Sequence, residues 1–401
     1  MIRDLKKIFN FSKTDLIVGG GLVLILIFYY AVILTGRIAT DLQPHAKMAH
    51  GFAQEGVKLP ANFLYFFLVA LFSGFSKHYV VYYIPTVFLL CSVIAAKYFI
   101  TKHYFTRFCL FSDKKAKHAY LLAAAMLFVF ALPGVNYFLS DEFYMGQLVP
   151  NVWHNSTIIF LMPFSILLFF KSYNYLFLRT EKSSKEKLEI LLLVLANALI
   201  KPSFLFALLP SVAVYFLLEN IIAKKNKIPW TNILPFFIGV VVITIEYYLI
   251  YKLYFVGSAG NEKNKSDVII APFVIWKIFS PNCLVAFLTS CFFPLVYIII
   301  TKGQVLKSKL VQFAAVNYVI GLLIWILLAE DGIRKSDGNF YWQIVAVSYL
   351  LFLTLLIEFV NSVRRGTITK TKQWLIGGVF SLHFIWGVYY WLKIIIFKGY
   401  S

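Results

Sequence analysis

The chain has 401 residues, of which 60% are hydrophobic, 18% are aromatic and only 14% are charged. A soluble domain of this length needs more charge to cover its surface, so the composition excludes an ordinary water-soluble protein and favours a lipid bilayer as solvent. The net charge of +20 does not indicate a nucleic-acid partner, because the basic residues lie in short clusters between apolar runs, as topology signals do.

Apolar runs of about 20 residues, enough to cross about 30 Å of hydrocarbon as a helix, recur along the chain. The polar–apolar alternation that a membrane barrel requires is absent, so we expect an all-α, polytopic transmembrane bundle. Eleven spanning helices are predicted, at 15–35, 79–100, 119–139, 152–171, 188–200, 203–221, 232–255, 273–300, 310–329, 340–360 and 374–396.

The segment 62–76, after the first outer loop, is not assigned to a span. It is short, Gly74 interrupts it and Lys77 follows it directly. We therefore expect a short interfacial or re-entrant helix there. If it crosses the bilayer instead, another predicted crossing is wrong, and the division most open to error is at Lys201-Pro202.

The remaining sequence features predict a single membrane domain. The first run, 15–35, is too long for the core of a cleavable signal peptide and lacks a small-residue cleavage site, so it is predicted to be a spanning helix. Three of the four cysteines lie inside apolar runs, which predicts buried thiols and no disulfide framework. No repeat or soluble segment is visible, so one transmembrane domain over 1–401 is expected.

Lys and Arg are unevenly divided between alternate loops. The N-terminus and the loops at 101–118, 171–187, 222–231, 301–309 and 361–373 carry 24 of them. The alternate set, which includes 36–61 and the C-terminal tail, carries nine. Because cytoplasmic loops hold the excess of positive charge, we expect a cytoplasmic N-terminus and a first outer loop at 36–61.

The first outer loop holds the candidate general base. Asp41 follows the first span closely, and a carboxylate beside apolar walls can take a proton from a sugar hydroxyl. Pro44 can open a short helix, on which His45 would share a face with Asp41 and contact substrate. Two alternatives remain: Asp41 caps that helix, or it joins His45 and His50 around a metal. Because a firm third ligand is missing, no metal and no cofactor is expected.

The second outer loop predicts carbohydrate binding. It places Asp141 beside Glu142, and later His154 beside Asn155, directly after Trp153. Carboxylates and amides bond to hydroxyl groups, and an aromatic ring can stack on a sugar. The alternative is an interfacial aromatic belt with solvated acids.

Three further residues are candidates because of where they interrupt apolar runs. Lys201, before Pro202, can hold a phosphate as a point charge, and the proline can free backbone groups to face a cavity. Glu246 and His383 lie within predicted spans, where ionisable residues are functional candidates by default. The alternatives are a plain loop lysine and two buried structural hydrogen bonds.

The link at 330–343 is denser in polar residues than a bare turn requires. It mixes both signs of charge with glycines that permit tight turns, and a guanidinium can fork onto a phosphate or carboxylate. The residues predicted to bind substrate are Glu330, Arg334, Asn339, Trp342 and Gln343. The last three begin the following helix, where they can point into a cavity.

Taken together, these features resemble the C-type membrane glycosyltransferase superfamily. The resemblance lies in Asp41 just after the first span and in the segment from Leu59-Pro60 through Tyr65 to Ser73-Gly74-Phe75. Ile200-Lys201-Pro202-Ser203 is similar to the Lys-Pro corner of the bacterial branch that uses polyprenyl-phosphate mannose.

The resemblance implies a hexosyltransferase with Asp41 as base and with Lys201 or Arg334 on the phosphate of a polyprenyl-phosphate sugar. It also implies a multi-pass protein of a bacterial plasma membrane, with the lipid tail in the bilayer and no nucleotide-binding domain. The chain lacks a soluble outer domain and an acidic pair in its first outer loop. These differences favour a glycolipid or surface-polysaccharide acceptor over a protein.

Two other functions stay open. A surface-polysaccharide polymerase usually has a large outer loop with several arginines, whereas here the longest outer loop has only Arg37. A flippase or transporter of lipid-linked sugars often shows internal repeats and paired broken helices. The sequence indicates one break and no repeat.

Overall fold

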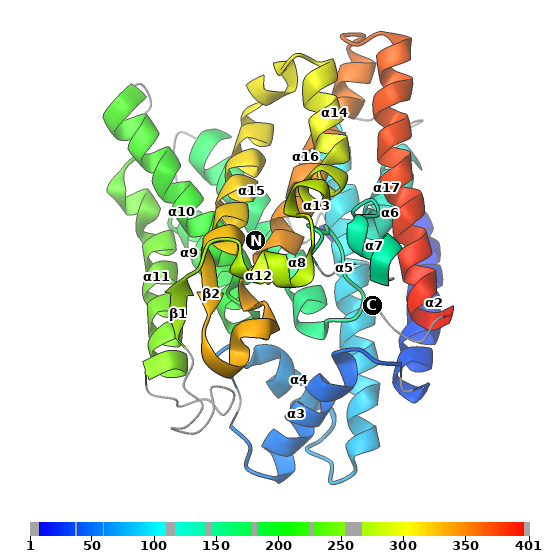
Figure 1. Ribbon diagram of the computed structural model, residues 1–401, viewed down its shortest axis with the longest axis vertical. Helices are drawn as coiled ribbons and strands as arrows, with labels where there is room; N and C mark the ends of the chain where they lie inside the picture. Colours follow the sequence, from blue (N-terminus) through cyan, green and yellow to red (C-terminus); the bar gives the residue numbers. More distant parts are fainter. Residues whose placement is uncertain are drawn as a thin grey trace.

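The computed structural model describes residues 8–36, 38–58, 60–109, 117–140, 144, 146–178, 183–223, 228–252 and 267–396. Within these ranges the protein is all-α apart from one two-stranded antiparallel ribbon (Figure 1). Eight helical stretches are long and apolar enough to cross a membrane, and a bent helix pair makes a ninth if it counts as one span. The prediction of an all-α, multi-pass membrane protein is thereby confirmed.

The first half of the chain forms nine α-helices within the described ranges. They are α2 (Lys13–Thr35), α3 (Leu42–Gln54), α4 (Leu64–Phe72), α5 (Tyr83–Cys109), α6 (Lys117–Phe128), α7 (Val135–Ser140), α8 (Ser156–Tyr173), α9 (Ser184–Ile200) and α10 (Ser203–Leu217). α4 has nine residues, too few to cross a bilayer, so the unassigned segment 62–76 is not a span.

Short 3₁₀-helices lie at Tyr79–Tyr82, Gln304–Lys307, Gly332–Asp337 and Asn339–Tyr341. The second half contains the remaining α-helices and the ribbon. They are α11 (Trp230–Tyr247), β1 (Val268–Ile270), α12 (Val274–Phe279), α13 (Cys283–Ser290), α14 (Phe292–Ile300), α15 (Lys309–Leu327), β2 (Leu328–Glu330), α16 (Trp342–Arg364) and α17 (Lys370–Ile396). π-helical turns extend α8, α10 and α11, at Asn174–Leu178, Leu218–Ala223 and Tyr248–Lys252.

The predicted count of eleven spans is wrong, because two of the segments are broken and a third forms a shorter helix. The segment 119–139 is a 12-residue α6, an extended stretch that contains Pro133, and a short α7. The segment 273–300 forms α12, α13 and α14, with a bend of 66° between the last two just before Pro294. α9 has 17 residues and stops before Pro202. Proline lacks an N–H and disfavours helix in the residue before it.

His383 of α17 joins the two broken segments. Its Nδ1 lies 2.6 Å from the carbonyl oxygen of Phe130, and its Nε2 accepts a hydrogen bond from the Phe293 amide at 3.2 Å. Each partner lies next to a helix break, where backbone groups lose their helical partners and the bilayer supplies no water. The structure therefore supports the structural alternative for His383, as a neutral ring that completes the hydrogen bonding of both breaks.

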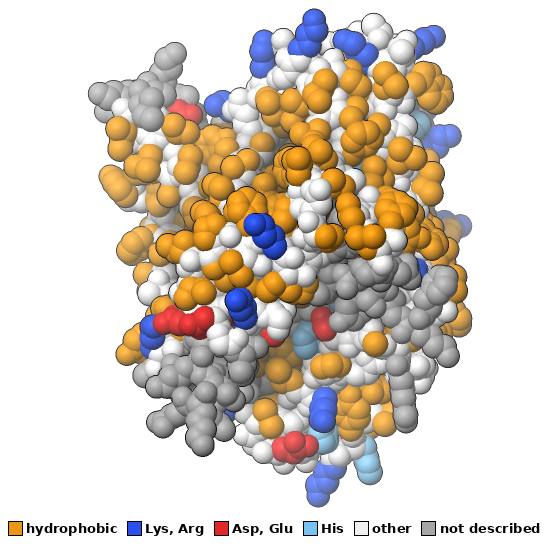
Figure 2. Space-filling model, viewed as in Figure 1, with side chains coloured by type: hydrophobic (Ala, Val, Ile, Leu, Met, Phe, Trp, Pro, Cys, Tyr) orange, Lys and Arg blue, Asp and Glu red, His pale blue; other side chains and the backbone are white. Residues whose placement is uncertain are grey.

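The ends of the bundle differ in charge. In Figure 1 the α14–α15 and α16–α17 turns lie at the upper end, and α3 and α4 lie at the lower end. Figure 2 shows Lys and Arg gathered at that upper end, above a largely hydrophobic middle. The basic loops 301–309 and 361–373 are thus opposite the first outer loop, as the charge count predicts.

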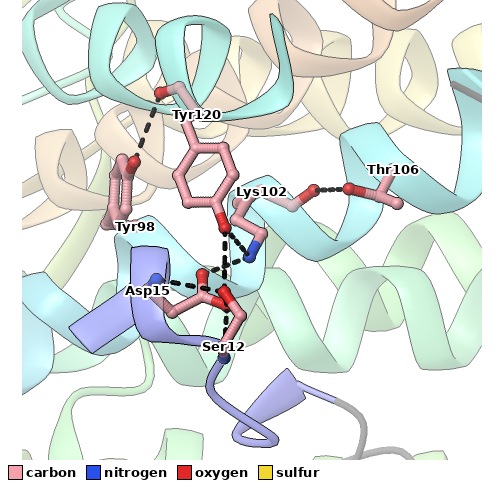
Figure 3. A network of polar contacts seen from close by, with 6 residues as sticks. All are labelled: Ser12, Asp15, Tyr98, Lys102, Thr106 and Tyr120. Carbon is pink, nitrogen blue, oxygen red and sulfur yellow. Dashed lines mark hydrogen bonds and ion pairs between the residues drawn. The ribbon is translucent and has the colours of Figure 1, made fainter. Parts of the chain in front are cut away.

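A polar cluster fixes the start of α2 against α5 and α6 (Figure 3). Ser12 and Asp15 form a capping box, in which the Ser12 amide donates to the carboxylate at 2.9 Å. Lys102 of α5 pairs with the other oxygen of Asp15 and donates to the Tyr120 hydroxyl of α6 at 3.1 Å. The first span is therefore held at its N-terminal end by a cap and an ion pair.

Two central helices carry the site. α8 and α16 are buried on nearly every face, as expected for helices that are apolar all round. The N-terminal ends of both helices lie near the junction with α9 and α10, where Asn155 caps α8 and Trp342 begins α16. Side chains at these ends are thus positioned by rigid elements.

Replacement of His383 by Ala should lower the free energy of unfolding by about 2 to 4 kcal/mol, because two buried backbone groups lose their partners. Thermal unfolding in detergent measures the effect, with the exposed His78→Ala as control. Equal melting temperatures for the two variants would contradict this role.

Single cysteines at exposed Lys335 and Lys370 should react with a membrane-impermeant maleimide from opposite sides of sealed vesicles. The half-buried Cys283 is replaced by Ala in this background, since the other three thiols are buried. Labelling of both positions from one side would overturn the proposed orientation.

Candidate functional site

A polar cavity of about 460 Å³ lies between α3, the N-terminal end of α8 and the 330–343 link. Its polar walls are made by Asp41, His45, Asn155, Lys201, Asp337 and Asn339. Its aromatic walls include Tyr144, Trp325, Tyr341 and Trp342. The cavity therefore brings together Asp41 and His45 of the first outer loop, Lys201 of the Lys-Pro corner, and Asn339 and Trp342 of the 330–343 link.

Asp41 occupies the N-cap position of α3, but its side chain does not cap the helix. Its carboxylate instead accepts a hydrogen bond from the side-chain amide of Asn155 at 2.7 Å. Its backbone amide donates to the carbonyl oxygen of His154 at 3.2 Å. The capping alternative for Asp41 is thus wrong, and the carboxylate faces the cavity.

Asn155 is oriented by the start of α8. Its side-chain oxygen accepts hydrogen bonds from the Ile158 amide at 3.1 Å and from the Thr157 hydroxyl at 2.9 Å. The side-chain N–H is therefore aimed at Asp41. Thr157 in turn accepts a hydrogen bond from the Lys201 ammonium at 3.3 Å. A continuous chain of hydrogen bonds thus runs from Lys201 through Thr157 and Asn155 to Asp41.

Burial shifts the pKa of both ends of this chain. Burial raises the pKa of Asp41 above its usual value, against the opposing effects of the Asn155 hydrogen bond and the Lys201 charge. Burial lowers the pKa of Lys201 to about 8, with Arg334 adding to the decrease and Asp41 opposing it. The Lys201 ammonium also lies 4.9 Å from the centre of the Trp342 ring.

His45 is a neutral wall of the cavity. Its Nδ1 is hydrogen-bonded to the Ser156 hydroxyl, and its ring contacts Tyr65 and Phe66 edge-on. Burial lowers its pKa to about 3, so the ring carries no proton charge at neutral pH. It can exchange a hydrogen bond with a substrate hydroxyl.

An apolar groove of about 510 Å³ adjoins the cavity. Its hydrophobic walls come from α10 and α11, and include Leu205, Phe206, Leu209, Val240 and Ile243. Lys201 and Asn339 line both the groove and the polar cavity. The two spaces therefore meet at the Lys201 corner, with an ammonium group at their junction.

Arg334 adds a second cation to the groove. Its Nε lies 3.3 Å from Glu330 and 3.6 Å from Asp337, and its guanidinium lies over the Tyr251 ring. The buried Nη1 of Arg334 has no hydrogen-bond partner among the described residues. An oxyanion in the groove can satisfy this donor, so Lys201 and Arg334 together form a candidate phosphate site.

Glu330 lies outside both spaces and holds lining residues of this part of the site in place. It is buried, and it accepts hydrogen bonds from Tyr251 and from the side-chain amide of Asn339. The π-helical turn at the end of α11 carries Tyr251. Glu330 is thus a positioning residue, since it does not line either space.

Other predicted residues lie outside the cavity walls. His154 is fully buried beside Tyr390, and Gln343 donates to the carbonyl oxygen of Gly321 at 3.2 Å. Trp153 packs against Tyr29 and does not line the cavity, so its predicted stacking on a sugar receives no support from the structure. Asp141 and Glu142 fall outside the described residues.

The metal alternative receives no support from the described residues. His50 bonds to the carbonyl oxygen of Lys77 and lies against Tyr79 and Tyr82, away from the cavity walls. No group of three His, Cys, Asp or Glu side chains within the described ranges is arranged to hold a metal ion.

Sequence reasoning missed several cavity residues. Trp325 has no signal that separates it from the many aromatic residues of a membrane protein. Tyr144 and Tyr341 lie in the second outer loop and in the 330–343 link, but nothing in the sequence separates them from the other aromatic residues there. Phe279 enters the wall only because the 273–300 segment is broken. Asp337 lies within the link that the sequence had singled out.

Comparison with known proteins adds no family to these observations, since neither a protein-family model nor a curated protein matches the chain.

An anion should bind this site less tightly as pH rises through about 8, because Lys201 then loses its charge. The probe is dodecyl methyl phosphate, whose single negative charge does not titrate in this range, measured by calorimetry in detergent. Lys201→Met should bind weakly and without the pH step. A flat affinity of the unmodified protein between pH 7 and 10 would contradict the assignment.

Proposed function

We propose that the protein is a membrane glycosyltransferase that moves a sugar from a polyprenyl-phosphate donor to a glycolipid or surface-polysaccharide acceptor on the outer face. The observation that carries the proposal is the junction of the two spaces at Lys201 and Asn339. A donor of this kind has an apolar chain, a phosphate and a sugar in that order. The groove, the two cations and the polar cavity follow the same order.

The chain of the donor fits the groove between α10 and α11, which exposes Val240 toward the surrounding lipid. The phosphate fits between Lys201 and Arg334, where an anion gains two charge-assisted partners. The sugar then lies in the polar cavity beside Asp41 and Trp342. No nucleotide is required, because the lipid phosphate serves as both leaving group and anchor.

In the transfer step, the acceptor hydroxyl oxygen attacks the anomeric carbon and its proton passes to Asp41. The bond from the anomeric carbon to the phosphate oxygen breaks, and the phosphate leaves with the electron pair. Lys201 and Arg334 stabilise the charge that develops on it. The raised pKa of Asp41 suits a general base, because it brings its proton affinity closer to that of the reacting group.

A flippase or transporter of lipid-linked sugars is the principal alternative. The two broken segments, α6–α7 and α13–α14, are a feature of transporters. His383 fills the space between these breaks, however, and neither break lines the cavity or the groove. A surface-polysaccharide polymerase is the second alternative. It would join many sugar units into a long product, whereas the proposed transferase adds a single sugar.

Asp41→Asn should reduce sugar transfer by about a hundredfold or more, because the amide cannot accept the proton. The assay follows label from a radiolabelled polyprenyl-phosphate hexose into a crude lipid acceptor. Glu55→Gln, an exposed acid at the end of α3, is the matched control. A products gel separates single additions from polymers.

Absence of covalent transfer by the unmodified protein, where a known transferase succeeds, would exclude the enzymatic proposal. Equal transfer by the protein and by Asp41→Asn would assign the base elsewhere. Movement of intact donor across vesicles would favour the transporter.

Asn155→Ala should move the acidic limb of the pH–rate profile to higher pH. Asp41 is active when ionised, so activity rises with pH through its pKa. The Asn155 hydrogen bond lowers that pKa, and its removal therefore raises it. A profile that stays in place, with only a lower maximum, would contradict this role of Asn155.

A further inference from the structure

Glu246 is not used by the proposed transfer reaction. It lies on α11 in the wall of the groove, among Ile243, Leu209 and Ile250. Its side chain is about 6% exposed, and neither carboxyl oxygen has a hydrogen-bond partner among the described residues. Glu246 is an ionisable residue at membrane depth, and such residues are functional candidates by default. A buried polar group without a partner is destabilising, so an occupant of the groove is the natural source of one.

The surroundings of Glu246 favour the neutral acid. Its neighbours in the groove are mostly apolar, and no ion pair to it is formed by the described residues. A neutral carboxylic acid presents one O–H donor. Its natural partner in a lipid environment is a carbonyl oxygen.

The depth of Glu246 fixes where that carbonyl must lie relative to an anion. Glu246 precedes Tyr251 by five residues on α11 and its π-helical extension, so its Cα lies about 7 Å from that of Tyr251 along the helix axis, toward the start of α11. Arg334 lies over the Tyr251 ring, so the unpartnered donor of Arg334 marks the anion level. The groove thus offers cations at one level and a hydrogen-bond donor one to two helical turns deeper.

We propose that the groove binds an anionic, ester-linked glycerophospholipid of the bilayer, with its phosphate at Arg334 and Lys201 and an ester carbonyl oxygen accepting a hydrogen bond from Glu246. Glycerophospholipids carry ester carbonyls a glycerol unit below the phosphate, which matches this order of groups. A polyprenyl chain has no oxygen at that level. The bound phospholipid fills the groove when no donor occupies it.

The site shares its cations with the proposed glycosyl transfer, but the binding of phospholipid does not depend on that reaction. Its test uses lipid binding alone. A failure of the sugar-transfer assay therefore leaves this inference intact, and the reverse also holds.

The experiment compares two lipids that differ only in the carbonyl groups. Purified full-length protein in detergent is titrated with phosphatidylglycerol or with its dialkyl-ether analogue, and bound lipid is counted by native mass spectrometry. The ester lipid should bind about fivefold more tightly, as expected for one neutral hydrogen bond. Equal affinity of the unmodified protein for both lipids would overturn the proposal without any variant.

Two variants assign the difference to Glu246. Glu246→Gln keeps an N–H donor and should retain most of the preference, whereas Glu246→Leu should bind both lipids equally. Arg334→Gln should weaken both lipids to a similar degree, because they carry the same phosphate. Preference for the ester lipid that persists in Glu246→Leu would overturn the assignment.

Discussion

The site depends on a chain of hydrogen bonds that separates two half-buried charges. Lys201 donates to Thr157, Thr157 to Asn155, and Asn155 to Asp41. No direct ion pair joins Asp41 to Lys201 among the described contacts. In surroundings of low polarity such a chain polarises along its length, so each charge is partly compensated. Both charged groups nevertheless remain available to a ligand, which a direct salt bridge would prevent.

The position of this chain follows from two helix ends. Asn155 and Thr157 belong to the start of α8, and Lys201 directly follows the last residue of α9. Pro202 sets the second end, because the residue before a proline is disfavoured in helical conformation, and Lys201 is extended with φ of −172°. The ammonium group therefore lies between an apolar and a polar space. A substitution that shifts the start of α8 or the end of α9 would therefore separate Asn155 and Thr157 from Lys201.

The bilayer explains why such a site contains so many buried polar groups. Because the bilayer core holds no water, each charged side chain, and each backbone group freed at a helix break, needs a hydrogen-bond partner from the protein or must face a cavity. Glu330 supplies partners to Tyr251, Arg334 and Asn339, and His383 supplies them to two helix breaks. Two buried groups in the groove lack a partner among the described residues, the Nη1 of Arg334 and the carboxyl of Glu246. We propose that ligands supply these missing partners, a phosphate for Arg334 and an ester carbonyl oxygen for Glu246.

The sequence predicts the class of this protein better than its details. Hydropathy and the asymmetry of Lys and Arg are summed over many residues, so single errors matter little. The same averaging hides the breaks at 129–134 and at Cys291, because an apolar run remains apolar where its helix is interrupted. For Asp41, Lys201 and Asn339, the sequence predicts that they lie on the same side of the membrane. It does not predict that they approach one another. Their contacts depend on Asn155 and Thr157, whose roles come from the cap of α8.

The most direct test of the account is a cryo-electron microscopy structure with a non-hydrolysable polyprenyl-phosphonate sugar bound. We expect the phosphonate between Lys201 and Arg334, the chain between α10 and α11, and the sugar in the cavity beside Asp41. An analogue bound with its phosphonate away from both cations, or with its sugar outside the Asp41 cavity, would contradict it.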